Sequence, residues 1–202
     1  IAQMKLPPVS NFNVKDYKGG NQNWSIDSDD KCVYIANNEG LIEFDGINWY
    51  LNALPNKTIV RSVKVVGDKI YVGSYEEFGF WQRAATGKLE YTSLSKDISQ
   101  ADVTSQSIWE IYKLNDRVIF KSFGALFIYK NNKIKVLKPK FLLMAATVFN
   151  GKFIVQGIGK GLLELDDYKL KLIDNSNELA DKRVQSLITF KDNKLLIGTS
   201  LN

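Results

Sequence analysis

The 202-residue sequence contains no histidine, and this absence excludes several kinds of chemistry. Without an imidazole there is no Ser-His-Asp or Cys-His nucleophile, no histidine-ligated zinc and no axial histidine for a haem. The single cysteine, Cys32, excludes an internal disulfide and sites built from several cysteines, and we expect it to be a small buried residue. We therefore expect no metal site and no cofactor. An enzyme that works through carboxylates alone remains compatible with the composition, as does a binding module.

Long hydrophobic runs are also missing. The longest candidate, residues 141–149, is about half of the ~18 residues that a membrane-spanning helix requires, so this segment is not expected to enter a membrane. Apolar residues at 45% and charged residues at 24% are typical of a folded globular chain. The net charge of +5 is mildly basic, but the basic residues are scattered and the densest stretch, residues 130–140, is interrupted by Asn131 and Asn132. We expect solvated lysines on strand faces and no nucleic-acid partner for this segment.

What the sequence does contain is a repeated four-strand unit. Each unit begins with an apolar strand that leads into a tight polar turn, and the turns recur at irregular intervals of about 40 residues, near the length of a propeller blade. The turns contain the Gly, Asn and Asp residues that tolerate positive φ: residues 28–30, 67–68, 115–116, 150–151 and 192–193. Of only four prolines, Pro55 and Pro139 fall between units, where they remove no ladder hydrogen bond.

The strands that follow each turn show a gradient from apolar to polar. Expected second strands are residues 33–36, 70–73, 118–120, 153–155 and 195–198, third strands are 40–44, 78–81, 124–127 and 161–165, and fourth strands are 49–51, 89–92, 134–137 and 170–173. Inner strands of a radial blade are buried on both faces, whereas the outer strand meets solvent and needs polar residues. Residues 175–184 could form a turn of helix within a loop.

These patterns predict an all-β fold, a β-propeller of four-stranded antiparallel blades. The blades are expected over residues 21–54, 58–95, 106–138, 141–174 and 183–202, the last one incomplete, which gives a partial arc of about four and a half blades. A β-sandwich is the alternative, but it does not explain why one four-strand unit recurs.

The first two units resemble a known family. Residues 23–26, 34–46 and Trp49 resemble the opening blade of the two-component-regulator propeller family, and residues 58–63 with 70–79 resemble its second blade. These propellers form the periplasmic sensor part of membrane-spanning regulators in Bacteroidetes. There they are usually followed by a triple-tyrosine domain, a transmembrane helix, and a histidine kinase or a helix-turn-helix output.

The resemblance implies a periplasmic, ligand-sensing segment of a membrane-anchored parent protein, with an oligosaccharide as its small-molecule ligand. Such propellers usually have about seven blades. The N-terminal segment, residues 1–20, would supply an outer strand to a last blade through residues 12–14. An open arc would also expose apolar blade faces, so we expect self-association or the remaining propeller blades to cover them.

The expected site lies where the innermost strands and the loops between second and third strands gather. The candidate ligand-binding residues are Trp24, Asn38, Arg61, Tyr75, Glu76, Trp109 and Gln185. Rings that stack on sugar faces beside amide, carboxylate and guanidinium groups suit a carbohydrate, and Arg61 also suits an acidic sugar.

Two structural alternatives remain open for these residues. Trp24 and Trp109 could instead pack between neighbouring blades, and Arg61 could pair with Glu76 or Glu110. No catalytic residue is assigned, because Glu76 and Glu77 are adjacent on a strand and point to opposite faces.

The leading hypothesis is a sensor that binds and signals without catalysis. A carbohydrate-active enzyme on a propeller scaffold and a protein-interaction scaffold are the rival hypotheses.

Overall fold

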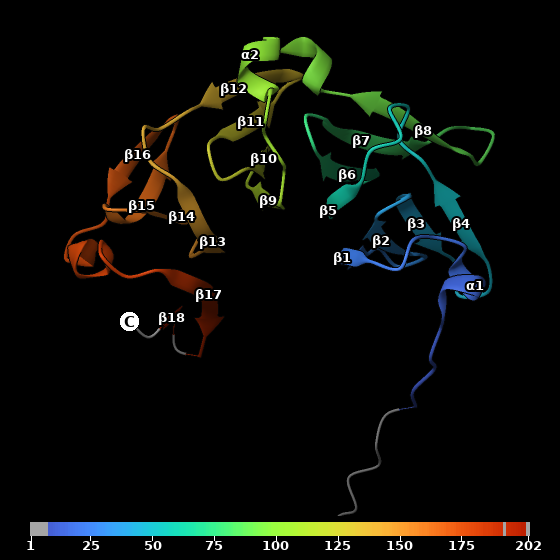
Figure 1. Ribbon diagram of the computed structural model, residues 1–202, viewed down its shortest axis with the longest axis horizontal. Coiled ribbons are helices and arrows are strands. Elements are labelled where there is room, and N and C mark those ends of the chain that lie inside the picture. The colour runs from blue at the N-terminus through green and yellow to red at the C-terminus, as the bar shows by residue number, and fades with distance from the viewer. Residues whose placement is uncertain (1–7, 192, 201–202) are drawn as a thin grey trace, which may run out of the picture.

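The chain forms four four-stranded antiparallel sheets and one two-stranded sheet, which lie side by side around an open arc (Figure 1). This computed structural model describes residues 8–191 and 193–200. Within each four-stranded sheet the strands follow one another in chain order, so that neighbours in sequence are neighbours in the sheet. The predicted all-β propeller architecture and its partial arc are confirmed.

The first sheet contains β1 (Asn23–Ser28), β2 (Val33–Asn37), β3 (Gly40–Phe44) and β4 (Trp49–Asn52). The second contains β5 (Val60–Val66), β6 (Lys69–Ser74), β7 (Phe78–Arg83) and β8 (Leu89–Ser93). The third contains β9 (Glu110–Leu114), β10 (Arg117–Lys121), β11 (Leu126–Lys130) and β12 (Lys133–Leu137). The fourth contains β13 (Leu143–Phe149), β14 (Lys152–Gly157), β15 (Gly161–Asp166) and β16 (Lys169–Leu172), and β17 (Val184–Phe190) pairs with β18 (Lys194–Thr199).

Short helices occupy the connections. The helix η2 (Ser176–Leu179) lies within the loop where the sequence predicted a helical turn, whereas α1 (Val14–Tyr17), η1 (Ser95–Asp97) and α2 (Gln100–Val103) were not predicted. No helix in the described part of the chain is long and apolar enough to cross a membrane.

The hairpin turns use the residues that the sequence pattern indicated. Asn150 and Gly151 both have positive φ, 49° and 72°, which is the twist that joins β13 to β14 without splaying the strands. Gly67 between β5 and β6 has φ of 63°. Of the predicted turn at residues 192–193, Asn193 has φ of 55°, and Asp192 lies outside the described residues.

Each hydrophobic core lies between two neighbouring sheets. Along β6, Tyr71 packs into the core shared with the third sheet, while Ile70 and Val72 pack into the core shared with the first. Strand β10 repeats this arrangement, since Phe120 faces the second sheet and Ile119 faces the fourth. The middle strands are therefore buried on both faces, which explains their uninterrupted apolar runs.

The N-terminal segment covers the outer face of the first sheet. The Phe12 ring lies 5.1 Å from the Trp49 ring, and Trp49 stacks on Phe44 at 4.1 Å between ring centroids. Asn13 caps α1 with a capping box, because its side chain accepts from the helix backbone while its own N–H donates to the Asp16 carboxylate at 2.7 Å. Tyr17 is buried at the end of this helix. The pairing of residues 12–14 with a further blade stays a prediction.

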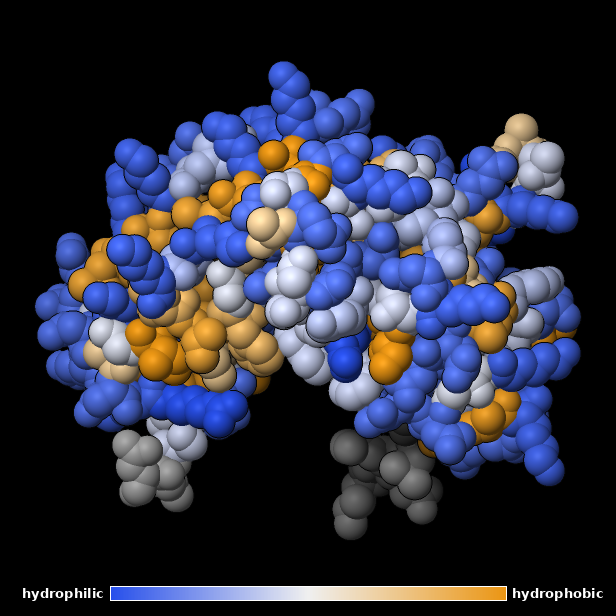
Figure 2. All heavy atoms as spheres, turned by 45° about the horizontal axis from the view of Figure 1, so that its top comes forward, coloured by the Kyte–Doolittle hydropathy of each residue, from blue (hydrophilic) through white to orange (hydrophobic). Residues whose placement is uncertain are grey.

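The opposite end of the arc leaves apolar side chains exposed. Ile188, Phe190 and Leu196 on the two-stranded sheet are each more than half exposed, and Ile188 lies directly opposite Leu196. Figure 2 shows apolar atoms gathered on the left of the molecule, the side on which Figure 1 places the fourth sheet and β17. Single exposed apolar residues are ordinary, but several on one sheet mark a face suited to packing.

Strand boundaries agree closely with the sequence pattern, with one informative shift. The third strand of the third sheet was expected from Gly124 but begins at Leu126. The Ser122 hydroxyl oxygen accepts the N–H of Gly124 and of Ala125, at 3.2 and 2.8 Å. This side chain closes a tight turn, which delays the start of the strand.

Candidate ligand-binding site

All seven predicted residues lie at the end of the sheets where the innermost strands begin. Trp24 and Arg61 stand near the starts of β1 and β5, and Trp109 directly precedes β9. Asn38 follows β2 and Tyr75 follows β6, so both lie in loops between second and third strands. Because neighbouring strands are antiparallel, these loops and the starts of the inner strands share one end of the molecule.

Three predicted residues are the extra residues of β-bulges. In β1 the pairing shifts between Asn23 and Ser25, which leaves Trp24 unpaired. Arg61 occupies the same place in β5, between Val60 and Ser62. A bulge re-aims the side chain of its extra residue and interrupts the ladder.

The same irregularity recurs in two of the three remaining inner strands, whereas β9 pairs with β10 without a register shift. Gln185 is the extra residue of β17, and β13 shifts between Leu143 and Ala146. Met144 therefore belongs to the same repeat position, although the sequence reasoning did not select it. Alignment of the repeats would have found it, because the bulge recurs at this place in four of the five inner strands.

The guanidinium of Arg61 lies between two indole rings that come from the neighbouring sheets. Its central carbon is 4.4 Å from the ring centroid of Trp109 and 5.0 Å from that of Trp24. The two rings are themselves 5.8 Å apart, nearly edge to face. Three consecutive sheets thus contribute one residue each to a Trp–Arg–Trp cluster, which we name the central cluster, and cation–π attraction holds its members together.

The charge of Arg61 has no acidic partner among the described residues. The Nε atom is buried without a hydrogen-bond acceptor, and no described residue accepts from either Nη atom. The two pairings considered from the sequence do not occur. Glu110 pairs with the Lys121 ammonium at 2.7 Å, and the Glu76 carboxylate accepts the Ser105 N–H at 2.7 Å. Both carboxylates are therefore occupied elsewhere.

Asn38 joins the central cluster through a hydrogen bond. The indole Nε1–H of Trp24 donates to the Asn38 Oδ1 at 2.8 Å. On the other side, the Trp109 ring lies 5.9 Å from the Phe123 ring, and the Lys121 ammonium lies 5.3 Å from the same Phe123 ring. Phe123 is more than a third exposed, so it extends the aromatic surface toward the fourth sheet.

The other three predicted residues, Tyr75, Glu76 and Gln185, form no hydrogen bond, ion pair or cation–π contact with Arg61. Glu76 adopts a left-handed conformation with φ of 54° and binds the Ser105 backbone. Its carboxylate raises the pKa of the exposed Tyr75 hydroxyl. Gln185 is exposed at its bulge, and no hydrogen bond or ring contact joins it to a described member of the central cluster. The structure therefore brings together Trp24, Asn38, Arg61 and Trp109.

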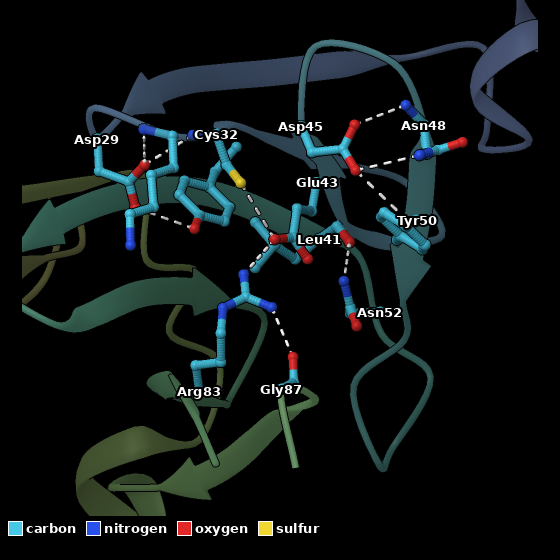
Figure 3. A network of polar contacts seen from close by, with 12 residues as sticks. Asp29, Cys32, Leu41, Glu43, Asp45, Asn48, Tyr50, Asn52, Arg83 and Gly87 are labelled. Carbon is cyan, nitrogen blue, oxygen red and sulfur yellow. Dashed lines mark hydrogen bonds and ion pairs between the residues drawn. The ribbon is translucent and has the colours of Figure 1, made fainter. Parts of the chain in front are cut away.

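A second polar region, which the sequence reasoning missed, lies at the other end of the sheets. It lines a cavity of about 710 Å³ between the first and second sheets. Figure 3 shows the Glu43 carboxylate there, accepting from the Arg83 guanidinium and from the Cys32 thiol, the latter at 3.4 Å. Cys32 is buried as predicted, and this burial, together with Glu43, raises the pKa of its thiol.

The neighbouring Asp29 is held in the same way. Its Oδ1 accepts the N–H groups of Lys31 and Cys32 at 2.8 and 2.7 Å, and its Oδ2 accepts the Tyr34 hydroxyl at 3.1 Å (Figure 3). Burial alone would raise the pKa of Asp29, but these hydrogen bonds outweigh it and lower the pKa. Hydrogen bonds from neighbouring residues satisfy the carboxylates of both Asp29 and Glu43. The ion pair between Glu43 of the first sheet and Arg83 of the second joins these two sheets.

No cluster of three or more acidic or cysteine side chains in the described ranges could hold a metal ion.

Comparison with known proteins identifies the fold. No family model and no curated protein matches the sequence. Among solved structures, the extracellular domain of the putative one-component system BT4673 from B. thetaiotaomicron matches 96% of this chain with a TM-score of 0.69 and 15% identity. The extracellular domain of the putative hybrid two-component system BT3049 from the same organism matches 91%, with a TM-score of 0.67 and 19% identity.

A further match is an enzyme, since an ancestral GH74 protein covers 90% of the chain at a TM-score of 0.65 and 15% identity. The chain spans about a quarter of the length of the BT4673 and BT3049 domains, 27% in each case. At these identities the likeness concerns the fold. The chain therefore has the β-propeller fold of the extracellular domains of Bacteroides sensor systems, as the residues of its first two repeats predicted.

Proposed function

We propose that this chain is part of a periplasmic ligand-sensing propeller that belongs to a membrane-anchored transcriptional or two-component regulator. The observation that carries the proposal is the central cluster, in which a cation without an acidic partner is held between two indoles at the face where the inner strands meet. The fold that it shares with extracellular domains of sensor systems gives independent support.

An oligosaccharide is the ligand class that we assign to this face. The C–H faces of sugars stack on aromatic rings, and the rings of Trp24, Trp109 and Phe123 follow one another across the first and third sheets. Sugar hydroxyls need polar groups beside the rings, and Asn38 and Arg61 supply them.

Signalling would follow because a bound ligand contacts several sheets at once. The central cluster joins the first, second and third sheets, so a ligand bound there favours one relative arrangement of these sheets over others. Domains beyond this segment would transmit that preference to a kinase or to a DNA-binding output.

Binding without turnover is supported by the state of the acidic groups at this face. A glycosidase needs two carboxyl groups on either side of the scissile bond. Here Glu110 is paired with Lys121, and Glu76 is bound to the Ser105 backbone.

The test combines a glycan array with thermal unfolding of the chain. A ligand at about 100 times its Kd stabilises the folded state by about 2.7 kcal/mol, which raises the Tm by roughly 5–10 °C in a chain of this size. Trp109→Ala should remove the shift, whereas Tyr50→Ala, a change of an exposed aromatic residue outside the site, should leave it intact.

Other outcomes would favour the rival functions. Hydrolysis of a bound glycan that disappears in Glu76→Gln would make the protein an enzyme. A stable protein complex without any saturable small ligand would make it an interaction scaffold.

The exposed end of the arc supports a second part of the proposal, that self-association or further propeller blades cover the β17–β18 face. Ile188 and Leu196 lie opposite one another there, and both are more than half exposed. If copies associate through this face, Ile188→Ser with Leu196→Ser should lower the mass measured by sedimentation, and Thr189→Ser should not. An unchanged mass in the double variant would remove this face from the association.

A further inference from the structure

The central cluster presents hydrogen-bond donors. The indole nitrogen of Trp24 can only donate, so the Asn38 atom that faces it at 2.8 Å is the oxygen, and the amide nitrogen of Asn38 remains as a donor. No described residue accepts from that amide nitrogen or from the Trp109 indole N–H. The two Nη groups of Arg61 also have no acceptor among the described residues, and its Nε is buried without one.

The nearby carboxylates make their contacts with other groups and not with Arg61. Glu110 is bound to Lys121, whose side chain is only 2% exposed and therefore depends on that carboxylate for its charge. Asp27, on the same strand as Trp24, pairs with Lys64 at 2.9 Å. A buried N–H without an acceptor is costly, so Arg61 is poorly explained as a structural residue alone.

The aromatic contacts of Arg61 also limit how it can bind. The two indole rings, at 73° to each other, lie 4.4 and 5.0 Å from its central carbon, so the Nη N–H groups, which no described residue accepts, are its means of recognition. In-plane N–H pairs match the two oxygens of a carboxylate or a sulfate.

We propose that the site recognises an oxyanion, a carboxylate or sulfate group carried by the ligand, through Arg61 with the Asn38 amide and the Trp109 indole as additional donors. This inference rests on the proposed sensing function and narrows its ligand class from glycans in general to acidic glycans. A neutral ligand would cover the cation without supplying its counter-charge, and is disfavoured for that reason.

The test uses the 202-residue chain, glucuronate and inorganic sulfate as probes, and tryptophan fluorescence as the signal. Glucose and sodium chloride at matched ionic strength are the controls. We expect a saturable change with glucuronate, with sulfate or with both, and none with glucose or chloride. A response to glucuronate alone assigns the carboxylate, and a response to sulfate alone assigns the sulfate ester. No saturable response to either probe, or an equal response to glucose, overturns the proposal.

Two variants connect the signal to the site. Arg61→Gln should weaken probe binding by about tenfold to a hundredfold, the range for a lost charge-assisted hydrogen bond. Lys113→Gln is the matched control, because it removes one positive charge from an exposed position on β9. Asn38→Asp retains an acceptor for Trp24 but replaces a donor of the proposed site with a negative charge, so it should also weaken binding while the fold is kept. Unchanged binding in both Arg61→Gln and Asn38→Asp overturns the assignment.

The two proposals can fail separately. Neutral and acidic glycans bound equally on the array would leave the sensor in place and remove the oxyanion specificity. A saturable probe response without binding of any glycan would keep the oxyanion site and remove the carbohydrate.

Discussion

For the ion pair between Glu43 and Arg83, we predict that replacing Arg83 destabilises the fold more than neutralising Glu43 does. The Glu43 side chain is 7% exposed and the Arg83 side chain is 43% exposed. Removing Arg83 leaves a buried carboxylate with little besides the Cys32 thiol as a donor. Removing the charge of Glu43 leaves a guanidinium that water and the Gly87 carbonyl already solvate in part.

The magnitudes follow from this asymmetry. We expect Arg83→Met to lower the free energy of unfolding by about 2–3 kcal/mol, because one half of a buried pair is stranded and the exposure of Arg83 reduces the full effect. Glu43→Gln should cost about 1 kcal/mol, since the neutral amide keeps the shape and one acceptor. In the double variant no charge is stranded, so its cost should fall below that of Arg83→Met alone.

Urea unfolding monitored by far-UV circular dichroism and tryptophan fluorescence measures these differences. With a slope of about 2 kcal/mol/M for a chain of this size, Arg83→Met should lower the midpoint by about 1 M and Glu43→Gln by about 0.5 M. Adding Glu43→Gln to Arg83→Met should raise the midpoint again. Equal costs for the two single variants, or costs that simply add in the double variant, would refute the argument from burial.

Two further predictions concern stability. Phe153→Ala should lower the free energy of unfolding, measured with urea, by about 3–5 kcal/mol, because Phe153 is fully buried between the third and fourth sheets. Phe190→Ala, at an exposed position, should lower it far less. Similar values for both variants would contradict the assigned cores. The lowered pKa of Asp29 means that its hydrogen bonds stabilise the fold above the ordinary carboxyl pKa near 4 and are lost as the pH falls through the lower folded value. Acid unfolding of Asp29→Asn should therefore start from a lower stability at neutral pH and depend less on pH between about 5 and 2 than that of the parent chain.

Local sequence signals predict most of the fold because each repeat is specified by its own turns and strands. Asn150–Gly151 and Gly67 adopt the positive φ values for which those residues are suited. The strand at residues 40–44 begins and ends where its apolar run does. The helices η1 and α2 were not anticipated, since they lie in an irregular connection between the second and third sheets, where no periodic pattern operates over so few residues.

The site was predicted in part, and the missing part depends on contacts between distant residues. Trp24 and Arg61 could be selected because they hold equivalent positions near the starts of inner strands. Their cluster with Trp109 could not be predicted, because it depends on how three sheets curve toward one another. The alternative in which Arg61 pairs with Glu110 does not occur, and Glu110 instead pairs with Lys121 on the adjacent strand.

The placement of each middle strand between two cores has a consequence for how the molecule loses its structure. Every sheet in the middle of the arc is supported from both sides, so opening one interface weakens the next, and unfolding should spread from neighbour to neighbour as in a linear array. The two-stranded sheet is supported by the fourth sheet on one face only. Its amides should therefore exchange with deuterium first and those of β10, in the middle sheet, last, so that protection is lost from the ends of the arc toward its middle.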